Sequence, residues 1–412
     1  MALSASIDTR EPSVRIEPSR ASLAPTRARG GSNDAFSFWK LPQDWEAALE
    51  CEIAESKAIA QHYLFEEYLA REDRRPPSRM QAYYAIKSLI PAAVRHRLNS
   101  AAIKMRAKRE FPRWPCESAL VDYWRDWLRI NLHSLKMTDA WHIGFWPDGM
   151  KSCIVLTHDV ESPLGMSRME RMADLEERYN FRSSWNLPLA QYEIDWKLVE
   201  RLRQRGFEFG AHGLSHDGRF FRSESDFTEL APLLQERARE HGLNGFRAPS
   251  TLRRGEWITR LSFDFDCSFS DSDPYEPQPG GTCSVFPFFL AHMVELPYTM
   301  PQDHTLIHLL HRSPMEIWAM KAKWIESLGG MILTLVHPDY CGSGNYLDEY
   351  ENLLKQLNDF QSAWRALPSE VSAWWRCRDR MQLTVRGDFP SIAGPGSDRA
   401  VARMLSSEPL VD

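Results

Sequence analysis

The sequence predicts an α/β fold whose main domain is a (β/α) barrel of parallel strands. From residue 151 onward, seven short apolar or β-rich runs recur, and helical patterns separate several of them. Strands and helices that alternate along a chain are typical of parallel sheets with right-handed crossover connections. Ionisable residues directly follow several of the apolar runs. In (β/α) barrels the functional residues gather at this carboxyl end of the strands.

The barrel is expected to occupy residues 150–389. The predicted strands are 153–157, 182–187, 207–211, 245–248, 263–269, 293–297 and 331–336. The helical patterns between them are clearest at 166–179, 196–204, 229–240 and 314–328. Strand and helix therefore alternate over most of this region, which favours one continuous domain.

Three flanking segments differ from the barrel in composition. Residues 1–35 are rich in Arg, Ser, Ala and Pro without an apolar period, which predicts a disordered tail. Residues 36–149 have a mostly helical pattern and are expected to form a helical region. Residues 390–412 lack any pattern and are predicted to be a loose C-terminal tail.

Residues 71–113, within the helical region, form a strongly basic segment. They hold twelve Lys or Arg and three acids, a net charge of +9, so the rest of the chain carries −15 to give the total of −6. Apolar residues from Ile90 to Met105 recur at steps of three and four, which predicts an amphipathic helix with a basic face. We favour a helix packed on the barrel with its basic face in solvent. The alternative is a weak contact with an anionic membrane surface or a lipid-linked substrate.

The composition argues against several classes of protein. The net charge of −6 argues against nucleic-acid binding. The apolar runs are far shorter than a membrane span, and no basic start is followed by the apolar core of a secretory signal. Seven scattered cysteines without a Cys-x-x-Cys pair indicate reduced thiols. We therefore expect a cytoplasmic protein, at most peripheral to a membrane.

Two acids and two histidines follow predicted strands. Asp159 and Glu161 come after the first strand and are two residues apart, so both point the same way if the strand continues. His212 and His216 come after the third strand. Carboxylate and imidazole ligands suit a divalent metal ion, of which zinc is our first expectation.

Two further ionisable residues follow predicted strands. Arg247 stands where it could pair with a carboxylate and fix its charge and orientation. His337 would enter the site from the other side as a proton donor. His304 and His308 follow no strand end, and we interpret this pair as structural. Asp303 either lines the groove or caps a helix that begins near His304.

These motifs resemble those of the polysaccharide deacetylases of the NodB-homology type, carbohydrate esterase family 4. The five segments that carry the resemblance, in the order of the family's motifs, are 157–161 (THDVE), 212–216 (HGLSH), 246–249 (FRAP), 266–274 (DCSFSDSDP) and 335–338 (LVHP). Each motif alone is loose, but five in the right order are specific. The resemblance covers about residues 150–385 and implies a distorted barrel of seven or eight strands.

The resemblance also implies a function. It suggests metal-dependent hydrolysis of an N-acetyl group on an amino sugar, in a saccharide or its precursor. It implies that Asp159 is the catalytic base, that Arg247 orients this base, and that His337 is the catalytic acid. The fourth motif would line the substrate groove. The implied ligands of the divalent metal are Glu161, His212 and His216.

The chain departs from the family pattern in two places. The family commonly has two adjacent aspartates, whereas Val160 separates Asp159 from Glu161 here, so the roles of the two acids could be swapped. Ser250 follows the third-motif proline in place of the usual aromatic residue. These departures leave open a non-catalytic saccharide-binding protein on the same barrel. Relatives of the fold open other amide bonds, so a non-sugar amidohydrolase is the second enzymatic alternative.

Overall fold

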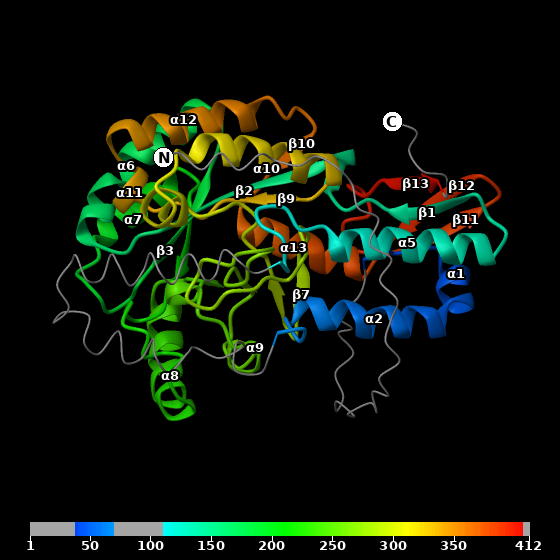
Figure 1. Ribbon diagram of the computed structural model, residues 1–412, viewed down its shortest axis with the longest axis horizontal. Coiled ribbons are helices and arrows are strands. Elements are labelled where there is room, and N and C mark those ends of the chain that lie inside the picture. Colours follow the sequence, from blue (N-terminus) through cyan, green and yellow to red (C-terminus); the bar gives the residue numbers. More distant parts are fainter. Residues whose placement is uncertain (1–37, 70–109, 407–412) are drawn as a thin grey trace. The chain divides into compact units, whose positions relative to one another are not determined.

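The computed structural model describes residues 38–69 and 110–406, which belong to one compact unit (Figure 1). The predicted disordered tail, residues 1–35, lies outside the described residues. So do residues 71–109, which make up nearly all of the basic segment. The predicted membrane or lipid contact of that segment is therefore untested.

The centre of the fold is one nine-stranded sheet (Figure 1). Hydrogen-bonded neighbours follow the order β10-β2-β3-β4-β5-β6-β8-β7, and β9 pairs with β2. All pairs are parallel except β7 with β8. The strands are β2 (Ser152–Asp159), β3 (Ser183–Leu187), β4 (Glu208–Ala211), β5 (Gly245–Phe246), β6 (Phe265–Asp266), β7 (Phe288–Leu290), β8 (Met293–Glu295), β9 (Met331–Leu333) and β10 (Ala363–Arg365).

The sheet curls until the segment after β8 meets β9. The backbone N–H groups of Thr299 and Met300 donate to the carbonyl of Leu333 at 3.1 and 3.0 Å. Strands β5 and β6 have only two residues each, so the barrel is distorted. The predicted α/β class with a distorted barrel is confirmed. Strands β7 and β10 add to the seven that the sequence predicted.

Every residue of β2 is buried, and the strand pairs with β3, β9 and β10. A continuous apolar run is typical of a strand that is covered on both faces. Its buried polar residues other than Ser152 have hydrogen-bond partners, as buried polar groups generally do. The Thr157 hydroxyl donates to the carbonyl of Thr334, and His158 Nε2 lies 2.6 Å from Glu176 Oε1 on α6. His158 therefore has a structural partner in the body of the barrel.

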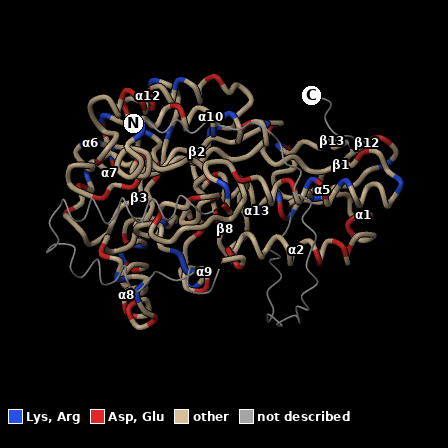
Figure 2. Tube along the Cα trace, in the orientation of Figure 1, with Lys and Arg blue, Asp and Glu red and all other residues tan. Residues whose placement is uncertain are grey.

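Three helices of the barrel begin at side-chain caps. Ser162 Oγ accepts from the N–H of Leu164 and of Gly165 at the start of α6, and Asp195 and Ser223 cap α7 and α8. Helices α10 and α12 pack together beside β2 and β9 (Figure 1). Charged residues of both signs lie along α8 (Figure 2). The helices are α6 (Pro163–Arg178), α7 (Trp196–Gln204), α8 (Glu224–Glu240), α9 (Gly255–Ile258), α10 (Pro314–Leu328), α11 (Pro338–Cys341), α12 (Gly344–Asn358) and α13 (Pro368–Asp379), with short turns η1 (Pro147–Gly149), η2 (Pro249–Thr251) and η3 (His304–Leu309).

Elements outside the barrel come from both ends of the described chain. Before the barrel lie α1 (Gln43–Ala48), α2 (Glu50–Leu64), α5 (Ala119–Ser134) and the strand β1 (Asp139–Ile143). After it lie β11 (Gln382–Arg386), β12 (Phe389–Ala393) and β13 (Ala402–Ser406). None of the described helices has the length and apolar character needed to cross a membrane.

The prediction of a loose tail from residue 390 is wrong for the residues up to 406. Strand β12 forms an antiparallel hairpin with β11, and β13 pairs antiparallel with β1. Strand β12 has no buried residue, and Phe389 is 80% exposed. The apolar signal of this strand is therefore weak. The partner of β13 also precedes the barrel in sequence, so no local pattern indicates the pairing, and β1 interrupts the predicted helical region.

A buried ion pair joins the N-terminal helices to the barrel. Glu66 follows α2, and Arg253 lies in the loop after β5. Arg253 Nε donates to Glu66 Oε2 at 2.7 Å, and Nη2 donates to Oε1 of the same carboxylate. The two side chains are 1% and 3% exposed. Arg253 Nη1 also donates to the carbonyl of Gln278 at 2.9 Å, so the guanidinium is held on several sides.

Replacing Glu66 by alanine should lower the free energy of unfolding by about 3–5 kcal/mol, because the buried Arg253 loses its carboxylate partner. Urea unfolding followed by circular dichroism measures this change. Glu67 is the matched control, since its side chain is 51% exposed. Glu67→Ala should change the free energy by less than about 0.5 kcal/mol. Equal losses in the two variants would contradict the assigned role of the ion pair.

Candidate metal centre

The side chains predicted from the sequence to form a site lie together at the C-terminal edge of the sheet. They are Asp159, Glu161, His212, His216, Arg247 and His337. Strand β2 leads into the two acids, β4 into the two histidines, β5 into the arginine, and the segment after β9 into the last histidine. These strands are parallel, so their carboxyl ends meet at one edge.

Glu161, His212 and His216 form a cluster of metal-ligand type. One ligand atom from each lies within 4.8 Å of the other two. His216 Nε2 is 2.8 Å from Glu161 Oε1. The His212 side chain is 1% exposed, whereas those of Glu161 and His216 are 22% and 21% exposed. The cluster is therefore buried on one side and open on the other, as a site that admits a substrate requires.

The hydrogen bonds of His212 leave one ring nitrogen directed at this cluster. His212 Nδ1 is 3.0 Å from the carbonyl of Arg247. Because a carbonyl oxygen only accepts, Nδ1 carries the proton and Nε2 keeps its lone pair. Nε2 is buried and has no hydrogen-bond partner among the described residues. Metal-bound histidines typically donate their other N–H to a backbone carbonyl, so this side chain fits a divalent metal.

A glycine brings His216 back to the cluster. Gly213 has φ of +69°, and a Cβ there would lie 2.6 Å from Pro249 Cγ, so glycine is required at this turn. His216 Nε2 then lies near Glu161 and 3.1 Å from the N–H of Ser250. One nitrogen cannot donate to the carboxylate and accept from the amide at once. Coordination of a metal through Nε2 would replace the contact with Ser250.

Asp159 is placed and charged as a general base requires. Its Oδ1 accepts from Arg247 Nη1 at 3.0 Å and from Asn186 Nδ2 at 2.9 Å. Its Oδ2 lies 3.7 Å from His212 Nε2. Burial alone would raise the pKa of Asp159, but the charged groups around it, Arg247 and His337 among them, and the hydrogen bond from Asn186 lower it to about 2. The carboxylate is therefore ionised at neutral pH.

His337 carries a positive charge, opposite to that of Asp159. Its Nδ1 lies 2.6 Å from Asp303 Oδ1, and its backbone N–H donates to Asp303 Oδ2 at 2.8 Å. Its Nε2 is 3.7 Å from Glu161 Oε1. Burial alone would lower the pKa of His337, but the carboxylates around it, chiefly Asp303, raise it to about 10. The imidazolium is a proton donor at neutral pH.

The sequence analysis missed the roles of two residues. Asp303 caps η3 by accepting from the N–H of His304 at 2.8 Å, as one of the two predictions for it proposed, but it also holds His337. No sequence signal links these two positions. Asn186 donates to Asp159 from the end of β3. Its position at a predicted strand end was a signal that could have identified it.

Two other predicted segments border the site without belonging to the ligand cluster. All of residues 265–276 are buried, so the fourth motif does not form an open groove wall. Asp271, a residue of this motif, pairs with Lys321 of α10, whose Nζ lies 2.7 Å from Asp271 Oδ2. The rings of His304 and His308 pack beside Tyr340, with ring centroids 5.7 and 4.5 Å away. This packing agrees with a structural role for the pair.

In structure, the chain resembles polysaccharide deacetylases. A protein named as a polysaccharide deacetylase from Mycobacterium smegmatis is 18% identical, with a TM-score of 0.47, and the match covers 56% of this chain and 92% of that one. A variant of the peptidoglycan deacetylase PdaC from Bacillus subtilis is 16% identical, with a TM-score of 0.36 and coverage of 55% and 93%. The allantoinase Puue is 11% identical, with a TM-score of 0.43 and coverage of 56% and 92%. No family model and no curated protein matches the chain. The function is therefore inferred from the residues of the site.

Proposed function

We propose that this chain is a metal-dependent hydrolase that removes an acetyl group from the nitrogen of an amino sugar, in a saccharide or its precursor. The observation that carries the proposal is the buried Nε2 of His212. It has no hydrogen-bond partner among the described residues and faces a carboxylate-rich cluster. Glu161 and His216 supply the other two ligand atoms. A mixed set of imidazole and carboxylate ligands favours zinc.

Asp159 is the proposed general base. When bound by this cluster, a divalent ion supplies Lewis-acid activation of an amide carbonyl and lowers the pKa of a coordinated water. Asp159 accepts the proton of the attacking water through the carboxylate that Arg247 and Asn186 hold in place. These contacts leave the other oxygen, Oδ2, facing His212 on the metal side.

His337 is the proposed general acid. Cleavage of the amide releases an amine, which is a poor leaving group until its nitrogen is protonated. Protonated His337 holds a proton on Nε2, the nitrogen that faces Glu161 across the site. Asp303 accepts from the other nitrogen, which fixes the ring and keeps it charged. The proposed base and acid are thus separate groups, each beside a different residue of the ligand cluster.

Metal analysis tests the site itself. The purified chain should contain about one equivalent of a divalent metal, and His212→Ala and His216→Ala should each lose most of it, because each removes a ligand. Mass spectrometry of the metal content measures this and identifies the ion. His308→Ala is the matched control, since this exposed residue belongs to the other His-x-x-x-His pair. Equal metal content in all four proteins would exclude the proposed ligands.

Acetate release tests the reaction. The metal-loaded chain should release acetate from N-acetylated oligosaccharides or their precursors, and His212→Ala should release none above background. Binding of these compounds without release of acetate would instead support the saccharide-binding alternative. Ring opening of cyclic amides without acetate release from sugars would support the non-sugar amidohydrolase.

A further inference from the structure

A cavity lies at the end of the sheet opposite the metal centre. Its volume is about 160 Å³. Lys151, which directly precedes β2, and Leu328, which lies shortly before β9, are among the residues that line it. The metal centre follows the carboxyl ends of the same two strands. A molecule in this cavity therefore does not contact the proposed reacting groups.

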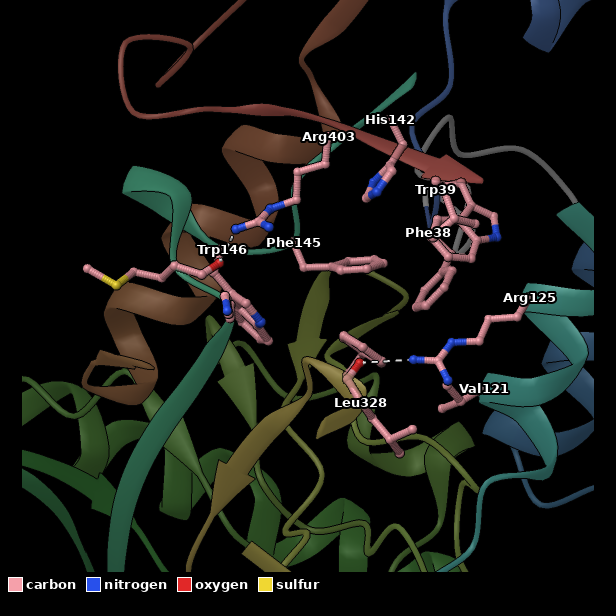
Figure 3. A pocket seen from close by; sticks show the side chains of 13 residues that line it. Phe38, Trp39, Val121, Arg125, His142, Phe145, Trp146, Leu328 and Arg403 are labelled. Carbon is pink, nitrogen blue, oxygen red and sulfur yellow. Dashed lines mark hydrogen bonds between the residues drawn. The ribbon is translucent and has the colours of Figure 1, made fainter. Parts of the chain in front are cut away.

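Five aromatic side chains among the described residues line the cavity. Figure 3 shows the rings of Phe38, Trp39, Phe145 and Trp146 around one space, and Phe286 also lines the cavity. The Phe145 ring centroid lies 4.8 Å from that of Phe38 and 4.6 Å from that of Phe286. The two indole N–H groups already donate to backbone carbonyls, that of Trp39 at 3.0 Å and that of Trp146 at 2.7 Å. The rings thus offer apolar surface to an occupant.

Cationic side chains stand on two sides of this aromatic space. Arg125 enters from α5 and Arg403 from β13 (Figure 3). Arg125 Nη2 donates a long hydrogen bond of 3.5 Å to the carbonyl of Leu328, whereas Arg403 Nη2 is held by the carbonyl of Gly149. No acidic side chain is among the described residues that line the cavity. Asp122, one turn before Arg125 on α5, is exposed and accepts from the hydroxyl of Ser118.

We propose that this cavity is a binding site for a small aromatic anion: a single ring that carries one carboxylate or phosphate. A cavity of about 150 Å³ with apolar walls is large enough to hold one benzene ring. Aromatic walls favour stacked or edge-on contact with such a ring. The acid group of the ligand would pair with Arg125, whose planar guanidinium matches the geometry of a carboxylate or phosphate.

Binding to the full chain tests this site. Isothermal titration calorimetry should detect saturable binding of benzoate or of phenyl phosphate. Benzyl alcohol keeps the ring but lacks the charge, so it should bind at least about tenfold more weakly. Acetate keeps the charge but lacks the ring that contacts the aromatic walls, so it should also bind at least about tenfold more weakly. Failure of both aromatic anions to bind, or equal affinity for benzyl alcohol, would overturn the proposal.

Three variants locate the binding. Arg125→Gln should weaken the binding of benzoate at least about tenfold. Arg129→Gln is the matched control one turn further along α5, where the side chain is 39% exposed and pairs with Asp126, and it should bind as the wild type does. His212→Ala should also keep full affinity, because the proposed site is separate from the metal centre. Loss of binding in Arg129→Gln or His212→Ala would show that the anion binds elsewhere and would reject the site. Unchanged binding in Arg125→Gln would reject it as well.

Discussion

Replacing Asp159 by asparagine should lower the rate of acetate release by at least two orders of magnitude while the chain keeps its metal. Asparagine has the same shape but no carboxylate, so it cannot accept the proton of the attacking water. General acid–base catalysis contributes about 10²–10⁴-fold to rates. The three proposed ligands, Glu161, His212 and His216, are unchanged in this variant. The measurement is the turnover number together with the metal content of the same preparation.

Glu161→Gln is the matched comparison, since it neutralises the other acid of the pair. It should lose metal as well as activity, because a neutral amide is a weaker ligand than a carboxylate. If Asp159→Asn instead lost the metal and Glu161→Gln kept it, the two acids would have the exchanged roles. The low pKa of Asp159, about 2, also predicts that its ionisation does not limit activity between pH 4 and pH 8.

The residues of the site that directly follow predicted strands could be predicted from the sequence. The apolar run that becomes β2 fixes where Asp159 stands, and parallel strands bring the ends of β4 and β5 to the same edge. This argument needs only the order of strands and helices along the chain. Arg247 and both histidines of the ligand cluster could therefore be predicted without knowledge of any contact.

The order of strands and helices does not predict where residues in irregular segments lie. Asp303 stands after β8 in a segment whose course depends on the closure of the barrel through Thr299 and Met300. Its contact with His337 is a consequence of that closure. Similarly, β13 acquires its strand structure from its pairing with β1. Predictions from local sequence fail at such places because the deciding contact lies far along the chain.

Replacing Asp303 by asparagine should make the enzyme fail progressively as the pH rises. The carboxylate of Asp303 is the main cause of the high pKa of His337, about 10, against the effect of burial. Without this charge the pKa of His337 should fall by roughly 1–3 units, as the loss of a neighbouring opposite charge typically causes. His337 would then lose its proton between about pH 7 and pH 9, where the wild type still holds it. The acid needed for amine departure is missing in the neutral form.

The pH profile of turnover measures this effect. The alkaline limb of the Asp303→Asn profile should move to lower pH by roughly 1–3 units, with the largest loss of activity above pH 8 and a smaller loss near pH 5. His337→Gln provides the comparison, because it removes the acid altogether and should be slow at every pH. A uniform fall in the Asp303→Asn variant, with the limb unmoved, would mean that Asp303 only orients the ring. A shifted limb would mean that the buried carboxylate sets the charge of the catalytic acid, because asparagine can accept the same hydrogen bond but cannot stabilise the imidazolium.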